Sequence, residues 1–246
     1  LGRLRWPAVG LCVAVVIAAL GLPTAVLGYW LVKGVSAGEP LTLVWSAARN
    51  SLYVSLLAAV AATILAVPVA ALAVRYPGNL SRFFGRLSHT GYALPGIVVA
   101  LALVFFGTRL AQPIYQTVWL LVFAYVVLFL PAALGSVRSS LMQVSPRIEE
   151  AARCLGHGRF RVMMSVTAPL TRSGLLMGGA LVFLVTMKEL PATLILGPLG
   201  FSTLASRIWS ASSEAFFAQA AAPALMLIFL SSVPLAVLMI RDRSRA

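Results

Sequence analysis

Long apolar runs without charged residues alternate with short polar segments along almost the whole chain. Six of these runs are long enough, or nearly so, to cross a hydrocarbon core of about 30 Å as a helix that rises about 1.5 Å per residue. They are continuously apolar, which predicts helices, because barrel strands alternate polar and apolar positions. The expected spans are residues 7–32, 52–74, 90–107, 118–134, 173–196 and 216–240.

The composition supports a membrane protein. Hydrophobic residues make up 61% of the chain and charged residues only 10%, whereas a soluble domain has about 25% charged residues. The longest polar interval, residues 135–172, leaves no room for a separate soluble domain. We therefore expect one all-α transmembrane domain over residues 1–246.

The basic residues are divided unequally between the two sides that six spans imply. Of 19 Lys and Arg residues, 14 fall in the N-terminal segment, the loops 75–89 and 135–172, and the C-terminal tail. Cytoplasmic segments carry the excess of Lys and Arg, so both termini and these loops are expected in the cytoplasm. A net charge of +13 is also typical of nucleic-acid binding. Scattering of the basic residues over four segments at one membrane face argues against a nucleic-acid partner.

The most polar stretch, residues 149–169, predicts a short helix, a glycine turn and a second helix. Ser145 suits an N-cap, Pro146 suits the first helical position, and Gly156 suits the left-handed residue that ends a helix. Glu149 and Arg153 have the spacing of a favourable ion pair on one helix face. The second helical pattern begins near Arg159. One narrow apolar stripe runs along the first helix through Ile148, Ala151, Ala152 and Leu155.

This stripe has two interpretations. A helix that lies on lipid usually presents large apolar residues, including tryptophan. The stripe instead contains two alanines and no tryptophan. A stripe of small residues suits docking into a groove of another protein, and this is the interpretation that we favour.

The same residues resemble the EAA loop of binding-protein-dependent ABC importer permeases. The family pattern is EAA, three residues, G, nine residues, and then I-x-L-P, in a cytoplasmic loop between two late spans. This chain has the motif in register, between its fourth and fifth expected spans. The matching positions are Glu150, Ala151, Ala152, Gly156 and Pro169, with Val166 and Ala168 in place of the family's Ile and Leu.

Three further stretches resemble the ferric-iron type of these permeases: RYPG at 75–78, YALPGIVVALAL at 92–103, and MKELPATLILGPLGFSTLASRIW at 187–209. In that group, two six-span halves are often fused in one polypeptide. This chain is most similar to a C-terminal half, an expectation with which its initial Leu agrees; a homodimer subunit is the alternative. Permeases for phosphonates or thiamine share parts of these stretches.

The resemblance implies a type I ABC importer bundle (MetI-like) with a cytoplasmic coupling helix, within the loop 138–170. It implies a bacterial inner-membrane protein that works with separate ATPase subunits, a second permease half or subunit, and a periplasmic binding protein. ATP and Mg²⁺ would bind to the ATPase, since the chain has no GxxxxGK[ST] motif and is not expected to be an enzyme or to hold a cofactor. The implied docking residues are Glu150, Ala151, Ala152, Arg153 and Gly156.

Two ionisable residues, Lys188 and Glu189, fall inside the fifth expected span. Such residues are costly in a membrane and are candidates for contact with the substrate or for gating. An ion pair within the bundle, at a bend set by Pro191, is an equally strong interpretation. Adjacent helical residues point about 100° apart, so each would pair with another group.

No metal site is expected in the chain. Ferric ion prefers oxygen ligands, and the acidic residues within the membrane or on its outer side are only Glu39, Glu189 and Glu214, which do not cluster. Transient passage of the ion therefore fits better than tight binding. An ion-coupled secondary transporter would favour buried carboxylates in several spans, and a membrane scaffold would leave the EAA register unexplained.

Overall fold

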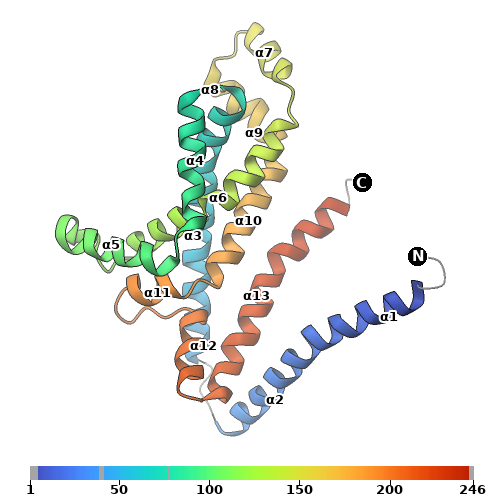
Figure 1. Ribbon diagram of the computed structural model, residues 1–246, viewed down its shortest axis with the longest axis vertical. Helices are drawn as coiled ribbons and strands as arrows, with labels where there is room; N and C mark the ends of the chain where they lie inside the picture. Colours follow the sequence, from blue (N-terminus) through green and yellow to red (C-terminus); the bar gives the residue numbers. More distant parts are fainter. Residues whose placement is uncertain (1–4, 39–41, 77, 244–246) are drawn as a thin grey trace.

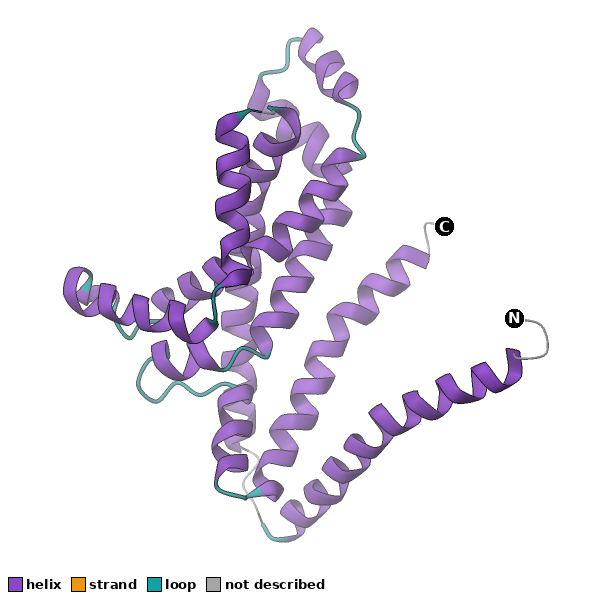
Figure 2. Cartoon of the chain, in the orientation of Figure 1, coloured by secondary structure: helices purple, strands orange, loops and turns teal. Residues whose placement is uncertain are grey.

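The computed structural model describes residues 5–38, 42–76 and 78–243, and all regular secondary structure in them is helical (Figure 2). This confirms the expected all-α fold. Four helices are long and apolar enough to cross a membrane, and the number rises to six if each of two bent helix pairs counts as one span.

Three helices form the core of the bundle: α3 (Thr42–Arg75), α6 (Val118–Met142) and α10 (Arg172–Met187). They pack against one another along the long axis of the molecule (Figure 1). The most deeply buried of the three is α6, in which 67% of the most apolar window is inside the structure. Because this helix is enclosed by its neighbours, its long apolar run is explained by protein packing as well as by the membrane.

Small residues allow these helices to approach closely. On α3, alanines at every fourth position from Ala58 to Ala70 are fully buried. On α10, a Cβ atom added to Gly178 would lie 3.1 Å from the carbonyl oxygen of Ala133 on α6, and one added to Gly174 would collide with Ser140. The GxxxG spacing in α10 therefore serves helix packing, as such motifs do in membrane proteins.

A long helical rod leaves the bundle at one end. It consists of α1 (Arg5–Val16), the π-helical turn η2 (Ile17–Gly21) and α2 (Leu22–Ser36), and only α2 lies beside α13 (Phe217–Arg243) (Figure 1). None of the most apolar window of the rod is buried in this chain. So large an apolar surface requires lipid or another protein around it.

The third expected span, 90–107, is not one continuous helix in the structure. The structure has α4 (Asn79–Ala93) and α5 (Gly96–Leu110), bent by 106° and followed by the short helix η3 (Gln112–Ile114). Leu94 is extended (φ −94°, ψ 127°) because the following Pro95 disfavours helical backbone there. The basic loop expected before this span is largely helix α4, whose polar side chains concealed it from a search for apolar runs.

The fifth expected span, 173–196, is also interrupted. Helix α10 ends at Met187, and a separate short helix, α11 (Pro191–Leu196), begins at the proline that prevents continuation. Helix α12 (Leu204–Ser213) follows, before α13. Since α6 continues to Met142, the expected coupling loop starts later than residue 138.

Candidate functional site

The motif-bearing segment lies at one end of the bundle, beyond α6 (Figure 1). Its first helix is α7 (Pro146–Cys154), and the chain returns to α10 through α8 (Arg159–Val162), η4 (Met163–Thr167) and α9 (Ala168–Leu170). Ser145 occupies the N-cap position with extended backbone, as predicted, but its side chain makes no capping hydrogen bond. The fixed φ of Pro146 in the first turn therefore contributes more to the start of α7 than the hydroxyl does.

A Schellman motif, with Gly156 as its left-handed residue, terminates helix α7 after Cys154. Gly156 has a φ of +85°, and its N–H donates to the carbonyl oxygen of Arg153 at 2.9 Å. The N–H of His157 donates to the carbonyl oxygen of Ala152 at 3.3 Å. This pair of bonds satisfies carbonyls that would otherwise lack partners, and the left-handed residue in it is normally glycine. The predicted glycine turn is confirmed.

Almost all the predicted docking residues are at the surface. Glu150, Ala151, Arg153 and Gly156 are exposed, and Ala152 is half-buried. The two large side chains of the apolar stripe are also exposed, Ile148 to 46% and Leu155 to 80%. The described part of the chain leaves this stripe uncovered, so a groove of another protein can receive it. Docking by these residues stays a prediction.

Glu149, next to the predicted docking residues, is buried and is 7% exposed. Its Oε1 atom accepts hydrogen bonds from Nη2 of Arg75 at 3.0 Å, Nε of Arg75 at 3.2 Å and Oγ1 of Thr167 at 3.1 Å. A buried charge is tolerated when it is paired and hydrogen-bonded. This carboxylate therefore joins α7 to the end of α3 and to η4.

Arg75 also binds the end of α6. Its Nη2 donates to the carbonyl oxygen of Val144 at 2.8 Å and, more weakly, to that of Leu141 at 3.4 Å. Cations often satisfy carbonyls at a helix C-terminus in this way. We refer to the side chains of Glu149, Arg75 and Thr167, with these two carbonyls, as the Glu149 network. The network connects the motif-bearing segment to α3 and α6.

Sequence reasoning missed this network. The expected pair of Glu149 with Arg153 is not formed, because Glu149 points into the bundle and pairs with Arg75, while Arg153 is exposed. Helical spacing finds partners only within one helix, whereas Arg75 lies 74 positions away. The available signal was that Arg75 opens the RYPG stretch of the family resemblance.

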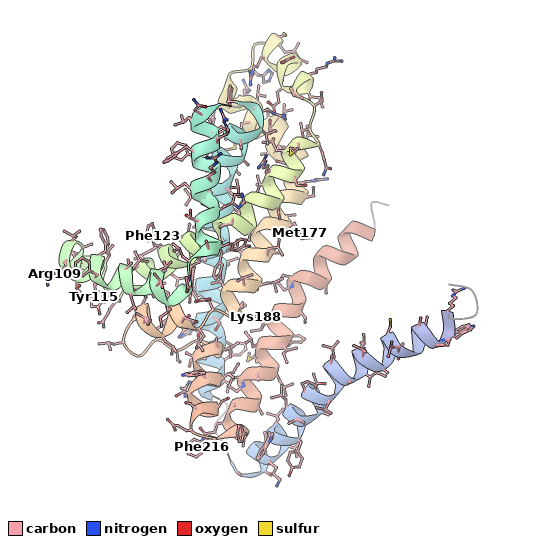
Figure 3. All side chains as sticks on the ribbon, viewed as in Figure 1. Arg109, Tyr115, Phe123, Met177, Lys188 and Phe216 are labelled. Carbon is pink, nitrogen blue, oxygen red and sulfur yellow. The ribbon has the colours of Figure 1, made fainter. Side chains whose placement is uncertain are left out.

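The structure places Lys188 and Glu189 in different surroundings. Lys188 follows the last residue of α10, and its side chain is exposed (Figure 3). Glu189 is half-buried, and its Oε1 accepts a hydrogen bond from the N–H of Ala192 at 3.2 Å. A Cβ atom on Gly96, the first residue of α5, would lie 2.7 Å from the same oxygen. The partner of Glu189 is thus backbone at a helix start, and of the two interpretations the ion pair within the bundle is not formed among the described residues.

Two further polar side chains hold this corner to α6, and neither was recognisable from the sequence. Oγ1 of Thr193 donates to the carbonyl oxygen of Glu189 at 2.6 Å, and Oη of Tyr125 lies 2.6 Å from the same Oγ1. Tyr125 and Thr193 are both buried. The break between α10 and α11 is therefore a fixed corner of the bundle.

Within the described ranges, no group of three or more His, Cys, Asp or Glu side chains is arranged to hold a metal ion. Glu39 lies outside the described residues, Glu189 is bound as stated above, and Glu214 follows the last residue of α12. Cys12 and Cys154 are both free thiols on the surface. The described residues provide no ligand set suited to a resident iron ion.

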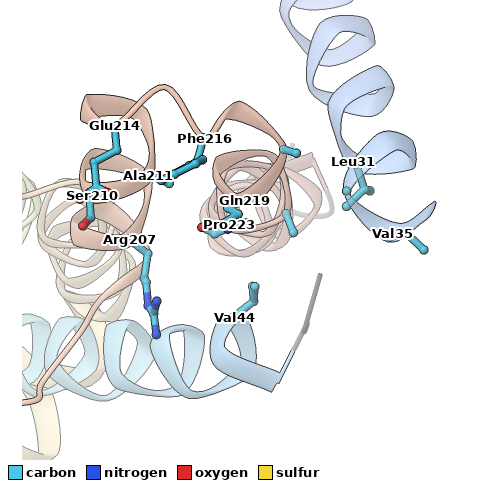
Figure 4. Close-up of a pocket in the computed structure, with 13 residues that line it drawn as sticks. Leu31, Val35, Val44, Arg207, Ser210, Ala211, Glu214, Phe216, Gln219 and Pro223 are labelled. Carbon is cyan, nitrogen blue, oxygen red and sulfur yellow. The ribbon is translucent and has the colours of Figure 1, made fainter. Parts of the chain in front are cut away.

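A cavity of about 370 Å³ lies at the opposite end of the bundle from α7, between α2, α12, α13 and the start of α3 (Figure 4). Arg207 of α12 and Glu214, just after this helix, both line it, and the Arg207 side chain extends towards α3. Nε of Arg207 is buried and has no hydrogen-bond partner among the residues that the structure describes. This cavity presents both signs of charge.

Known proteins provide relatives for most of the chain. It is 38% identical over 228 residues to the Fe(3+)-transport system permease protein FbpB 2 of Haemophilus influenzae. The aligned residues make up 92% of this chain and 45% of the Haemophilus protein. It is 32% identical over 163 residues to the molybdenum transport system permease protein ModB of Escherichia coli, and the aligned residues make up 61% of this chain and 70% of ModB. The chain thus spans about half the length of the Haemophilus protein.

The fold also occurs in a solved transporter. The inward-facing MetNI methionine ABC transporter matches with a TM-score of 0.67 over 85% of this chain and 99% of the matched chain, at 15% identity. At that identity, the likeness shows the fold alone. Residues 62–244 match the family described as "Binding-protein-dependent transport system inner membrane component". The chain belongs to this family of inner-membrane transport components, with a MetI-like bundle.

Proposed function

We propose that this chain is the membrane-spanning half of an ATP-binding-cassette importer that moves ferric iron from a periplasmic binding protein to the cytoplasm. The observation that carries the proposal is the construction of α7. Its small-residue stripe is uncovered, while its other side is attached to the bundle through Glu149. A helix placed in this way can be displaced by another protein and can transmit the displacement to the membrane helices.

The partner that docks on α7 is an ABC ATPase, with Glu150, Ala151, Ala152, Arg153 and Gly156 at the contact. ATP and Mg²⁺ bind to that subunit, and this chain performs no catalysis. When the ATPase subunits close, α7 is displaced. The Glu149 network passes the displacement to α3 and α6, and η4 passes it to α10. The bundle then alternates between inward-facing and outward-facing states.

The orientation follows from charge. The end of the bundle that carries α7 faces the cytoplasm, as do both termini, because the loops and terminal segments assigned to that side contain 14 of the 19 Lys and Arg residues. The opposite end, with α12, faces the periplasm and the binding protein. A second permease half or subunit completes the path and covers part of the exposed α1–α2 rod.

Ferric iron as the solute is supported by the 38% identity to the Haemophilus permease over 92% of this chain. The scarcity of acidic side chains fits transient passage, with recognition left to the binding protein. Lys188, exposed at the break after α10, and Glu189, beside it, remain the candidate residues for the path.

A second candidate is an oxyanion importer of the molybdenum type. It is favoured by the likeness to ModB. It is also favoured by the charges at the α10–α11 corner, where the Lys188 side chain is exposed while the Glu189 carboxylate accepts a hydrogen bond from the backbone N–H of Ala192. Uptake of radioactive iron and of molybdate by the same reconstituted transporter, with its binding proteins supplied in turn, decides between the two solutes.

The importer assignment is tested by co-purification with the ATPase of the same transport system. Glu150→Arg reverses a charge at the contact, and Gly156→Pro is incompatible with a φ of +85°. We expect both variants to lose the ATPase. Glu214→Arg, the same exchange at the other end of the bundle, is the matched control and should retain it. Full retention of the ATPase by both α7 variants would contradict the proposal.

A further inference from the structure

Helix α4 has two unlike sides. Arg82, Arg86 and His89 recur at the spacing of one helical stripe. On another side, Leu80, Phe83 and Leu87 are 62%, 60% and 52% exposed. A helix surrounded by water would not present three large apolar side chains together. This helix therefore lies at membrane depth, with its basic stripe at the polar boundary.

The basic stripe opens on a cavity of about 630 Å³ between α4, α6 and the end of α3. Arg82, Arg86 and His89 line it from α4, and Arg138 lines it from α6. Ser81, which is buried, adds a hydroxyl to the lining. Three guanidinium groups and one imidazole from two helices thus face one space. Both helices, α4 and α6, extend to the end of the bundle that carries α7 (Figure 1).

No acidic side chain of the described residues lines this cavity. Asn79 accepts a hydrogen bond from Arg82, but an amide oxygen does not neutralise a guanidinium group. Among the described residues, the ion pair is that of Arg75 with Glu149, outside this lining. The cavity of Figure 4 differs, since Glu214 accompanies Arg207 there. Like charges that converge at the edge of a membrane repel one another unless an anion joins them.

We propose that this cavity binds the phosphate group of an anionic phospholipid. Guanidinium groups form paired hydrogen bonds with phosphate oxygens, and basic pockets between membrane helices on the cytoplasmic side are suited to lipid headgroups. A lipid fits better than free phosphate because α4 also exposes apolar side chains on which acyl chains can lie. The bound headgroup joins α4 to α6 across the cavity and so holds the first half of the bent span in place.

This inference goes beyond the proposed transport activity and does not depend on which solute is carried. Its test uses the chain in nanodiscs of phosphatidylcholine that contain a minority of phosphatidylglycerol. Native mass spectrometry then counts the phosphatidylglycerol molecules that stay bound after release from the disc. The test variant is the triple exchange Arg82→Gln, Arg86→Gln and Arg138→Gln.

The matched control removes three arginines from the same end of the molecule but outside the cavity: Arg147→Gln, Arg161→Gln and Arg172→Gln. We expect the unaltered chain and the control to retain phosphatidylglycerol. The cavity variant should lose affinity on the order of a hundredfold, since each arginine near a lipid surface contributes about fivefold. Replacing the three cavity arginines by lysine should restore part of the affinity, which separates lost charge from lost folding.

Two results would overturn the proposal. Equal loss of lipid from the cavity variant and the control would show that the surface potential acts as a whole, without a site. Displacement of the lipid by millimolar inorganic phosphate would assign the cavity to a small free anion. Retention of the lipid under phosphate, together with selective loss in the cavity variant, supports a lipid site.

Discussion

Glu149 and Glu189 are two of only six acidic residues in the chain, and the structure holds them in opposite ways. The Glu149 carboxylate is paired with the Arg75 guanidinium and also binds Thr167. The Glu189 carboxylate accepts a bond from the backbone N–H of Ala192, beside the start of α5. At Glu149 the carboxylate charge is balanced by the Arg75 guanidinium, whereas at Glu189 the carboxylate serves as a hydrogen-bond acceptor at the start of α11.

This difference indicates that stability depends on the charge of Glu149 but only on the acceptor oxygen of Glu189. Removing one member of a buried ion pair leaves the other charge without compensation. Replacing a carboxylate that accepts from an N–H by a neutral acceptor keeps the bond. The same exchange of Glu for Gln should therefore lower stability more at Glu149 than at Glu189.

The largest effect is expected from Glu149→Gln. Arg75 would lose its countercharge in a buried site, at a cost of about 3–5 kcal/mol in the free energy of unfolding. Unfolding by a detergent titration followed by circular dichroism measures this cost. Because the network connects α7 to α3 and α6, the ratio of ATP hydrolysed to solute transported should also rise.

Glu150→Gln, the same exchange one position along on an exposed side chain, is the control and should leave unfolding unchanged. If the ATP-to-solute ratio stays constant while both rates fall together in Glu149→Gln, the network is structural only and does not transmit the motion of α7.

A smaller effect is expected at Glu189. Glu189→Ala removes the acceptor at the start of α11 and should lower stability by about 0.5–2 kcal/mol, as the loss of other N-terminal caps does. Glu189→Gln keeps the acceptor and should be close to the unaltered chain in the same titration. A Glu189→Gln protein that is stable but transports nothing would show instead that the charge acts on the solute.

Thr167→Val tests the neutral part of the Glu149 network. It removes one hydrogen bond to a carboxylate that keeps its arginine, so a loss of about 1.5 kcal/mol is expected. Combining it with Glu149→Gln in a double-mutant cycle measures the coupling of the two side chains. Strict additivity of the two changes would separate Thr167 from the network.

The smallest effect on stability is expected from Lys188→Met, because this side chain is exposed and has no ion pair with its neighbour Glu189. The thermal midpoint should not change, and the ATPase should still co-purify. Slower solute uptake under those conditions would support Lys188 as part of the path. Normal uptake would remove it from the candidates.

The all-α membrane fold, the α7 helix and the turn at Gly156 were predictable because their signals lie in consecutive residues. Apolar runs, helical spacing and a glycine at a helix end each depend on the local chain. The bends were predictable only in part. Pro95 and Pro191 mark where helices stop, but proline does not specify the 106° angle between α4 and α5, which depends on the packing of α5 against α11.

The sequence by itself determined that the chain has helices apolar enough to cross a membrane and which segments are basic, and it predicted where a partner protein would dock. Only the tertiary structure decided that Glu149 pairs with Arg75, 74 positions away, and that Glu189 lies against Gly96. The physical reason is that a buried charge takes whichever partner the packed helices bring within about 3 Å. Spacing along one helix indicates neighbours on that helix, and contacts between helices are set when small residues allow α3, α6 and α10 to pack closely.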